Sequence, residues 1–254
     1  MVQEFCKVAR VSEVAHNTFS LEFTSPQIAR TATPGQFVNI KIDRSPFPLL
    51  RRPMSVNDVG RETVKILFSV VGRGTALLAR AIPGETINVL GPLGHGFDLT
   101  RCSDLAIIVA GGLGVAPFPF LTRVLLQQNL PIVSFIGART VSQLALHGLT
   151  NVSVATDDGS KGFRGTVVDL LRSKLDRSGA SRQMIFACGP IPMLRSLLQF
   201  MREVIMPCQV SVETAMACGI GLCQGCPVEL ADGPQKYKLS CKDGPVFDLS
   251  KIVI

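Results

Sequence analysis

The sequence predicts a multidomain β and α/β protein made of three consecutive parts, and three observations carry this prediction. Short β-rich segments separated by Pro and Gly fill the beginning of the chain, strands alternate with helices in the middle, and four cysteines crowd the end. These patterns are typical of an antiparallel barrel, a parallel α/β sheet and a small cysteine-rich module, in that order. We therefore predict domains at 1–99, 100–206 and 207–254.

Length and composition indicate a folded protein. The chain has 254 residues, of which 46% are hydrophobic and 18% charged, which suits two or three domains with apolar cores. No apolar run reaches the length of a membrane span, and the N-terminus MVQEFCKVARV lacks the apolar centre of a signal peptide. Eight cysteines without such a signal point to a reducing compartment. We expect a cytoplasmic protein without a membrane span.

The net charge is +7, from 26 basic and 19 acidic residues. The basic residues are not clustered with aromatic ones, Trp is absent, and Tyr237 is the only tyrosine. We therefore expect no nucleic acid partner. The excess of positive charge is better suited to anionic phosphates or to an acidic protein partner.

The barrel is predicted from segments in which apolar and polar residues alternate or β-formers dominate. Turn residues such as Pro34-Gly35 and Pro83-Gly84 separate them. The six segments are 4–15, 18–25, 36–42, 53–59, 63–71 and 86–93.

Two stretches of this barrel have the residues of a phosphate site. LLRRPMSV supplies Arg52 and Ser55, whose guanidinium and hydroxyl can bind a pyrophosphate. VGRGTALLARA places Gly72, Gly74 and Thr75 ahead of a short helix, which is a second phosphate cradle. Each stretch alone is equally compatible with a hairpin turn or a solvated charge, but two in one barrel favour a nucleotide site.

The middle part predicts a parallel sheet with strands at 105–112, 131–139, 151–158 and 183–190 and helices at 116–128, 166–175 and 193–204. The first strand ends in a glycine turn that opens a helix, so the domain is Rossmann-like. The acidic residue that would bind a ribose is missing after the second strand, where Ala138-Arg139 stand. The residues thus leave NAD and NADP both open.

Two turns of this domain are candidate nucleotide contacts. Gly112 and Gly114 allow the backbone to approach a pyrophosphate. Cys188-Gly189 stands at the carboxyl end of a strand, where ligands bind in open α/β sheets, although a buried cysteine at a helix entrance is the simpler interpretation. The acidic pair Asp157-Asp158 and the three isolated histidines form no acid–base set, so no catalytic side chain is predicted.

The terminal cysteines are Cys218, Cys223, Cys226 and Cys241, spaced C-x4-C-x2-C with fourteen residues before the fourth. This spacing is the plant-type pattern of a [2Fe–2S] cluster. A structural zinc site usually has two C-x2–4-C pairs, and two disulfides would need an oxidising compartment. We predict that these four cysteines ligate a [2Fe–2S] cluster.

In order along the whole chain, RRPMS, VGRGT, GPLGHGF, AGGLGVAP, ACGP and C-x4-C-x2-C resemble the ferredoxin–NADP reductase superfamily. The ending, CGIGLCQGC followed by YKLSCKDGPVF, closely resembles the electron-transfer subunits of class 1B dihydroorotate dehydrogenases. The resemblance implies a subunit that binds FAD and a [2Fe–2S] cluster and accepts hydride from NADH. It would pass electrons to the FMN of a separate catalytic subunit, which oxidises dihydroorotate to orotate in pyrimidine biosynthesis, in a heterotetramer.

The resemblance also implies roles for individual residues. The FAD contacts would be Arg52, Pro53, Met54, Ser55, Leu67, Phe68 and Ser69, with Gly74 and Thr75 at the pyrophosphate. Gly112, Gly114, Cys188 and Gly189 would border the nicotinamide nucleotide. The sequence departs from the wider superfamily at Met54, where a tyrosine is usual.

The chain is thus predicted to be an NAD-dependent flavin and iron–sulfur oxidoreductase subunit. Two alternatives remain open at this point. One is an electron-transfer subunit of a hydrogenase or of an NADH-dependent ferredoxin:NADP oxidoreductase, which share the same three-part plan. The other is a zinc-stabilised binding protein with no redox role.

Overall fold

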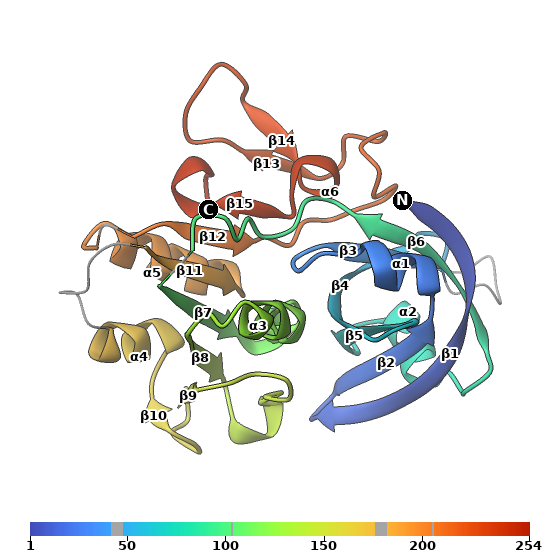
Figure 1. Ribbon diagram of the computed structural model, residues 1–254, viewed down its shortest axis with the longest axis horizontal. Helices are drawn as coiled ribbons and strands as arrows, with labels where there is room; N and C mark the ends of the chain where they lie inside the picture. Colours follow the sequence, from blue (N-terminus) through green and yellow to red (C-terminus); the bar gives the residue numbers. More distant parts are fainter. Residues whose placement is uncertain (42–47, 103, 176–181, 205) are drawn as a thin grey trace.

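The computed structural model describes residues 1–41, 48–102, 104–175, 182–204 and 206–254. A barrel and an α/β sheet lie side by side, and the cysteine-rich segment, coloured red in Figure 1, lies along both of them. The fold class predicted from the sequence is confirmed.

The barrel is closed, with strand order β1-β2-β5-β4-β3-β6 and antiparallel pairing throughout. Its inward residues, among them Leu21, Phe23 and Ile66, are fully buried, as the alternating sequence pattern predicts. The predicted segment at 36–42 ends on Ile42, which lies outside the described residues. The elements are β1 (Val2–Ala15), β2 (Thr18–Thr24), α1 (Pro26–Thr31), β3 (Phe37–Lys41), β4 (Arg52–Val59), β5 (Thr63–Ser69), α2 (Arg73–Ala79) and β6 (Thr86–Leu93).

The second sheet has the order β10-β9-β8-β7-β11-β12-β15. Every neighbouring pair is parallel except β12 and β15. Its strands are β7 (Leu105–Gly111), β8 (Ile132–Ala138), β9 (Val152–Thr156), β10 (Phe163–Arg164), β11 (Gln183–Cys188), β12 (Cys208–Ser211) and β15 (Val246–Asp248).

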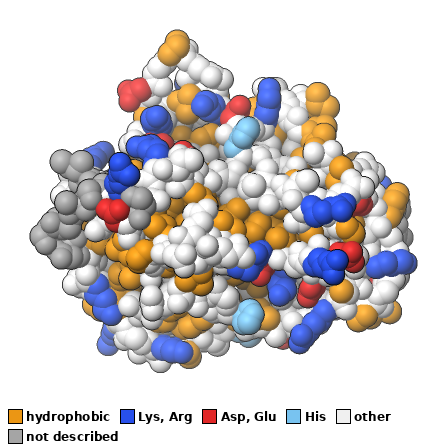
Figure 2. All heavy atoms as spheres, viewed as in Figure 1, with side chains coloured by type: hydrophobic (Ala, Val, Ile, Leu, Met, Phe, Trp, Pro, Cys, Tyr) orange, Lys and Arg blue, Asp and Glu red, His pale blue; other side chains and the backbone are white. Residues whose placement is uncertain are grey.

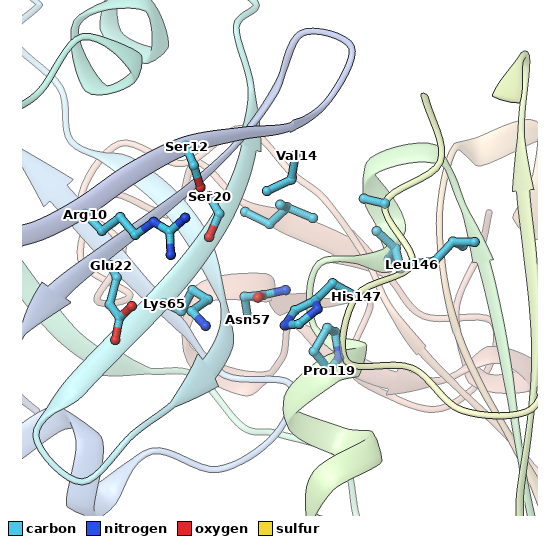
Figure 3. Close-up of a pocket in the computed structure, with 13 residues that line it drawn as sticks. Arg10, Ser12, Val14, Ser20, Glu22, Asn57, Lys65, Pro119, Leu146 and His147 are labelled. Atoms are coloured by element: carbon cyan, nitrogen blue, oxygen red, sulfur yellow. The ribbon is translucent and has the colours of Figure 1, made fainter. Parts of the chain in front are cut away.

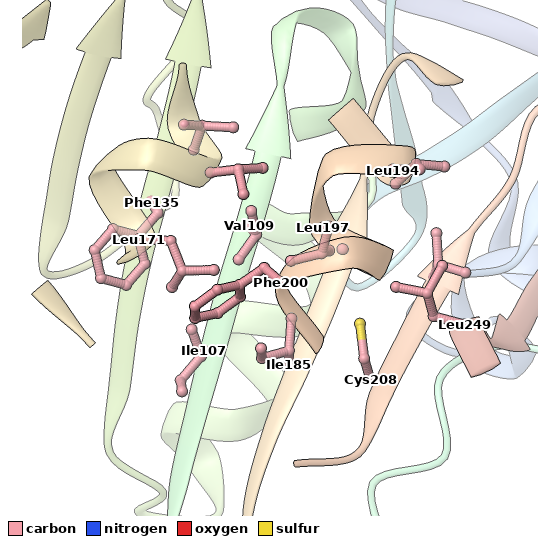
Figure 4. Close-up of a cluster of buried hydrophobic side chains, with 14 of the residues drawn as sticks. Ile107, Val109, Phe135, Leu171, Ile185, Leu194, Leu197, Phe200, Cys208 and Leu249 are labelled. Carbon is pink, nitrogen blue, oxygen red and sulfur yellow. The ribbon is translucent and has the colours of Figure 1, made fainter. Parts of the chain in front are cut away.

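Helices cover both faces of this sheet. The 3-10 turn η1 (Gly112–Val115) and α3 (Phe118–Gln127) pack on one face, and α4 (Val167–Lys174) and α5 (Ile191–Met201) pack on the other. Figure 4 shows the second of these cores, where Ile107, Val109 and Ile185 of the strands meet Leu171 and Phe200 of the helices. Burial on both faces explains why these strands read as nearly continuous apolar runs.

The cysteine-rich segment is inserted between two strands of the α/β sheet. It contains β13 (Pro227–Glu229), β14 (Tyr237–Leu239) and α6 (Ser240–Asp243), and it lies between β12 and β15, which pair with each other. The predicted division at residue 206 stays a prediction, but β12 and β15 lie beyond it and extend the α/β sheet. The 3-10 turn η3 (Leu249–Lys251) also packs into that core through Leu249.

Specific contacts hold the barrel against the α/β part. Arg123 of α3 lies 2.8 Å from Asp58 and donates to the carbonyl of Val59 at 2.9 Å. The side-chain amide of Asn57 donates to the carbonyl of Ala116 at 2.7 Å. The two bodies are therefore oriented by polar contacts from β4 to the η1–α3 region.

In the described part of the chain, no helix combines the length and the apolar character that crossing a bilayer requires. Figure 2 shows Lys and Arg side chains scattered over the visible face and not gathered into one patch. The absence of a nucleic acid partner remains a prediction.

Candidate functional site

A pocket of about 360 Å³ lies between the barrel and the α/β sheet. It brings together most of the residues for which the sequence predicts FAD contacts. Those that line it are Arg52, Pro53, Met54, Ser55, Leu67, Phe68, Ser69 and Thr75. Cys188, predicted at the nicotinamide, lines the same pocket from the other side.

Gly74 is not among the lining residues, but it determines where Arg52 lies. A Cβ on Gly74 would stand 2.8 Å from the guanidinium carbon of Arg52, so a larger residue at this position would push that side chain from its place. Arg52 also donates to the carbonyl of Leu50. A fixed guanidinium at the pocket rim suits a bound phosphate.

The hydroxyl of Thr75 is occupied by its own turn. It accepts the backbone N–H groups of Val71 at 3.0 Å and Gly72 at 3.2 Å. It also lies 3.0 Å from the carbonyl of Gly72, to which it donates. Thr75 therefore shapes the entrance of α2, and its predicted contact with a pyrophosphate would come from the backbone.

The far wall of the pocket was not predicted from the sequence. It comes from the last residue of β12, Ser211, and from the segment that follows, with Glu213, Thr214 and Met216. The Oγ1 atom of Thr214 is buried and has no hydrogen-bond partner in the protein. An orphaned hydroxyl in the wall of a cavity is the expected mark of a polar ligand, so together with the fixed Arg52 the residues present fit FAD.

Cys188 faces this wall and is a protonated thiol. Burial raises its pKa to about 12, and the nearby carboxylate of Glu213 adds to the effect. A neutral, buried thiol is a packing residue and not a nucleophile. Glu213 was not predicted as a pocket residue. The sequence sign for it is its place just after a strand, but that strand, β12, has only four residues and is too short to be predicted.

The glycine turns of the α/β part meet at the edge of this pocket. Gly112 has φ 56°, and a Cβ there would meet nothing within 4 Å, so this turn is open to a ligand. At Gly114, by contrast, a Cβ would stand 2.7 Å from the Cα of Gly189. Gly114 therefore lets the ends of β7 and β11 pack closely, and Gly112 is the better placed of the two for a nucleotide.

Figure 3 shows a second pocket, of about 290 Å³, between the outer face of the barrel and the loop that contains His147. Its polar lining includes Arg10, Lys65 and Asn57. Leu67 lines both pockets, and no other predicted site residue borders this one. The residues for which the sequence predicts cofactor contacts therefore gather at the first pocket.

The four predicted cluster cysteines lie in two pairs. Cys218 interacts with Cys223, and Cys241 interacts most strongly with Cys226 and also with Cys218. Among the described residues, no group of three or more His, Cys, Asp or Glu is placed to hold one metal ion. Two pairs of thiolates suit the two irons of a [2Fe–2S] cluster better than a single zinc ion.

Backbone N–H groups point at these sulfurs. The Sγ of Cys218 accepts from Ile220 at 3.5 Å and from Cys223 at 3.4 Å. Burial raises the pKa of Cys218, but these N–H groups outweigh burial and lower its pKa to about 6. For Cys241, burial and the nearby Cys226 raise the pKa to about 12. Donors aimed at sulfur are typical of iron–sulfur sites, so the segment fits the cluster.

The two pairs differ in burial. Cys226 and Cys241 are each 2% exposed, whereas Cys223 is exposed and Cys218 is half-buried. Beside Cys223, the apolar side chain of Leu222 is 77% exposed. One pair therefore faces the protein interior and the other faces solvent.

Comparisons with known proteins identify the terminal module. The family model for the iron–sulfur cluster binding domain of dihydroorotate dehydrogenase B matches residues 213–253. The cysteine module is therefore an iron–sulfur module, and the alternative of a zinc-stabilised binding protein is excluded.

The comparisons also cover the whole chain. It is 38% identical over 97% of both chains to the dihydroorotate dehydrogenase B (NAD(+)) electron transfer subunit of Desulforamulus reducens. It is 37% identical over 95% of both chains to that of Geobacillus thermodenitrificans.

Among solved structures, this chain is similar to the NADH-dependent reduced ferredoxin-NADP oxidoreductase, whose structure was solved for insights into flavin-based electron bifurcation. It has a TM-score of 0.86 and 26% identity, covering 98% of this chain and 90% of that one. A ferredoxin NADP+ reductase from Neisseria gonorrhoeae, with bound FAD and NADP, has the same fold, with a TM-score of 0.67. The match has 16% identity and covers 80% of this chain and 92% of that one. With relatives of 35–38% identity over nearly its full length, this chain belongs to the family of dihydroorotate dehydrogenase B (NAD(+)) electron transfer subunits.

Proposed function

We propose that this chain accepts hydride from NADH at a bound FAD and passes the electrons singly, through its [2Fe–2S] cluster, to the FMN of a separate dihydroorotate dehydrogenase catalytic subunit. The observation that carries the proposal is the adjacency of the two cofactor sites. Phe37 and Met216 line the flavin pocket and also pack in one apolar cluster with Cys226 and Cys241.

FAD, when bound, supplies the exchange between two-electron hydride chemistry and one-electron transfer. The chain's own residues provide binding and orientation. Arg52 and the backbone at the start of α2 would hold the pyrophosphate, and the hydroxyls of Ser55 and Thr214 would accept or donate hydrogen bonds. The open turn at Gly112 leaves the pocket edge accessible to the nicotinamide nucleotide. The raised pKa of Cys188 keeps its thiol neutral, and it would pack beside this nucleotide.

The partner is proposed to dock over the exposed cysteine pair. Leu222 and Ile220, at 77% and 37% exposure, flank Cys223 on the surface. An exposed apolar group beside an electron-carrying centre suits a contact that excludes water. A heterotetramer with the catalytic subunit, and its location in the cytoplasm, are part of this proposal.

Co-expression with a dihydroorotate dehydrogenase catalytic subunit tests the proposal. We expect a coloured complex that contains FAD, FMN and iron and couples NAD(H) to the interconversion of dihydroorotate and orotate. A coloured protein that reduces a dye with NADH, but neither binds that subunit nor passes electrons to it, would contradict the proposal that its FMN is the acceptor. The likeness to the ferredoxin-NADP oxidoreductase would then direct the search toward ferredoxin.

A surface variant tests the docking face separately. Leu222→Asp should abolish co-purification and leave the NADH:dye reaction intact, because it adds a charge to the contact at a side chain that is 77% exposed and does not line the flavin pocket. Ile82→Asp is the matched control, since Ile82 is 63% exposed on the barrel. If Leu222→Asp still forms the complex, the partner does not dock over the exposed cysteine pair.

A further inference from the structure

The flavin pocket and the buried cysteine pair share one wall. Phe37, which is 3% exposed, lines the pocket and packs in the apolar cluster that contains Cys226 and Cys241. Met216 lines the pocket as well and packs against the same cluster from the segment after β12. Two apolar side chains, those of Phe37 and Met216, are thus shared by the pocket and the cysteine cluster.

The register of β3 fixes the position of Phe37. Its neighbours Val38 and Ile40 point into the barrel core, so Phe37 and Asn39 point outward, toward the cysteine module. The amide of Asn39, a residue with no exposed surface, lies 3.4 Å from the carbonyl of Cys218. One face of a single barrel strand therefore contacts both ends of the cluster site, and Phe37 cannot leave it without a shift of register.

The burial of the four cysteines gives this arrangement a direction. Cys226 and Cys241, which pack with Phe37, are shielded from solvent, whereas Cys223 of the other pair is exposed. Solvent therefore has access to the cysteines from the side of Cys223.

We propose that Phe37 and Met216 form a dry passage through which electrons enter the cluster, at the iron held by Cys226 and Cys241. The iron held by Cys218 and Cys223 is then the exit toward the acceptor. This inference rests on the proposed function. Bound FAD would take up the two electrons and the one proton of the hydride from NADH, and would release the proton to solvent and the electrons one at a time. The cluster would carry each of these electrons singly, as the change of one iron between ferric and ferrous.

The test is single-turnover reduction of the full chain, loaded with FAD and cluster, by NADH without oxygen. Flavin reduction is followed by absorbance, and cluster reduction by electron paramagnetic resonance of rapidly frozen samples. In Phe37→Leu and in Met216→Ser, the ratio of the cluster reduction rate to the flavin reduction rate, both measured in the same sample, should fall severalfold below the wild-type ratio. Phe23→Leu is the matched control, because it makes the same change at a fully buried phenylalanine of the barrel core.

A second readout does not depend on turnover. Loss of the cluster to an iron chelator should be faster in both variants than in the control, because water reaches the inner cysteine pair. The Met216 variant tests the passage from the opposite wall if Phe37→Leu fails to load its cofactors.

Wild-type rates of both cluster reduction and chelation in the loaded variants would overturn the inference and leave the proposed function standing. If NADH does not reduce the cluster even in the wild-type protein, the proposed function itself is overturned.

Discussion

The backbone N–H of Gly221 donates a hydrogen bond of 3.1 Å to the Sγ of Cys241, across twenty residues of sequence. This bond joins the loop that contains the first three cysteines to the helix that contains the fourth. It depends on Gly221 at φ 84°, a conformation in which a side chain is strained.

Gly221→Ala should therefore weaken the cluster site. A non-glycine residue in the left-handed region costs about 1–2 kcal/mol, and the new Cβ would stand 3.2 Å from Lys242. We expect a lower iron content per chain after purification, with FAD content unchanged. Gly233→Ala is the control, because Gly233 also has a positive φ, of 101°, and open space around it. Equal iron content in the two variants would show that the Gly221 bond is unimportant.

Cys223→Ser should remove the visible absorbance of the cluster and electron delivery to the partner, and leave FAD bound. The reason is that Cys223 is exposed and does not line the flavin pocket. Visible spectra and iron analysis provide the measurement. The control is Cys102→Ala, since Cys102 is a buried cysteine in the core beside α3. A full cluster with normal electron delivery in Cys223→Ser would refute the ligand assignment.

Gly74→Ala should lower the affinity for FAD. The added methyl group would displace the guanidinium of Arg52, and a hydrogen bond to a charged group contributes about 1.5–3 kcal/mol. At about 1.4 kcal/mol per tenfold, the dissociation constant should rise about 10- to 100-fold. Titration of the FAD-free protein with FAD, followed by flavin fluorescence, measures it. Gly72→Ala is a close control, because a Cβ there meets nothing within 4 Å, and the same loss in both variants would count against the role of Arg52.

The thiol of Cys188 should make stability depend on alkaline pH. Burial, with help from Glu213, raises its pKa from 9.0 to about 12. Since the folded pKa is the higher one, the folded protein keeps this proton in a range where the unfolded chain releases it. The stabilisation is complete below pH 9.0 and is lost as pH rises toward 12, by about 1.4 kcal/mol per pH unit.

Urea unfolding on either side of pH 9.0 checks this expectation. The free energy of unfolding should fall less steeply with pH in Cys188→Ala than in the wild type, because the variant lacks one of the buried thiols whose pKa is raised. Parallel pH dependences would mean that Cys188 is not the source of the effect.

Much of the fold was predictable because local patterns determine it. The alternation of buried and exposed residues predicted all six barrel strands, and the apolar runs predicted the central strands of the α/β sheet, such as β7 and β11. The cysteine spacing predicted the iron–sulfur module, which the family comparison confirmed. Each of these patterns lies within a short stretch of the chain, so it can be recognised from the sequence before the fold is known.

What the sequence did not reveal depends on contacts between distant parts. β12 has four residues and β15 three, which is too short for a periodic pattern, and each is stabilised by pairing with a neighbour in the sheet. Missing β12 meant missing Glu213, Thr214 and Met216, which it directs into the flavin pocket. The double contact of Phe37, with the flavin pocket and with the cysteines, could not be predicted either. Nothing in QFVNIKI shows which outward-facing residue of the strand meets the cysteines.

The insertion of the cysteine module between the paired strands β12 and β15 determines how this centre can operate. Both ends of the segment are anchored by backbone hydrogen bonds to the same sheet, with Gln209 opposite Asp248. A carrier tethered at one end by a flexible linker can swing between donor and acceptor. A segment anchored at both ends cannot swing, so it acts as a stationary relay. The acceptor must therefore come to the cluster, and the geometry of docking controls delivery.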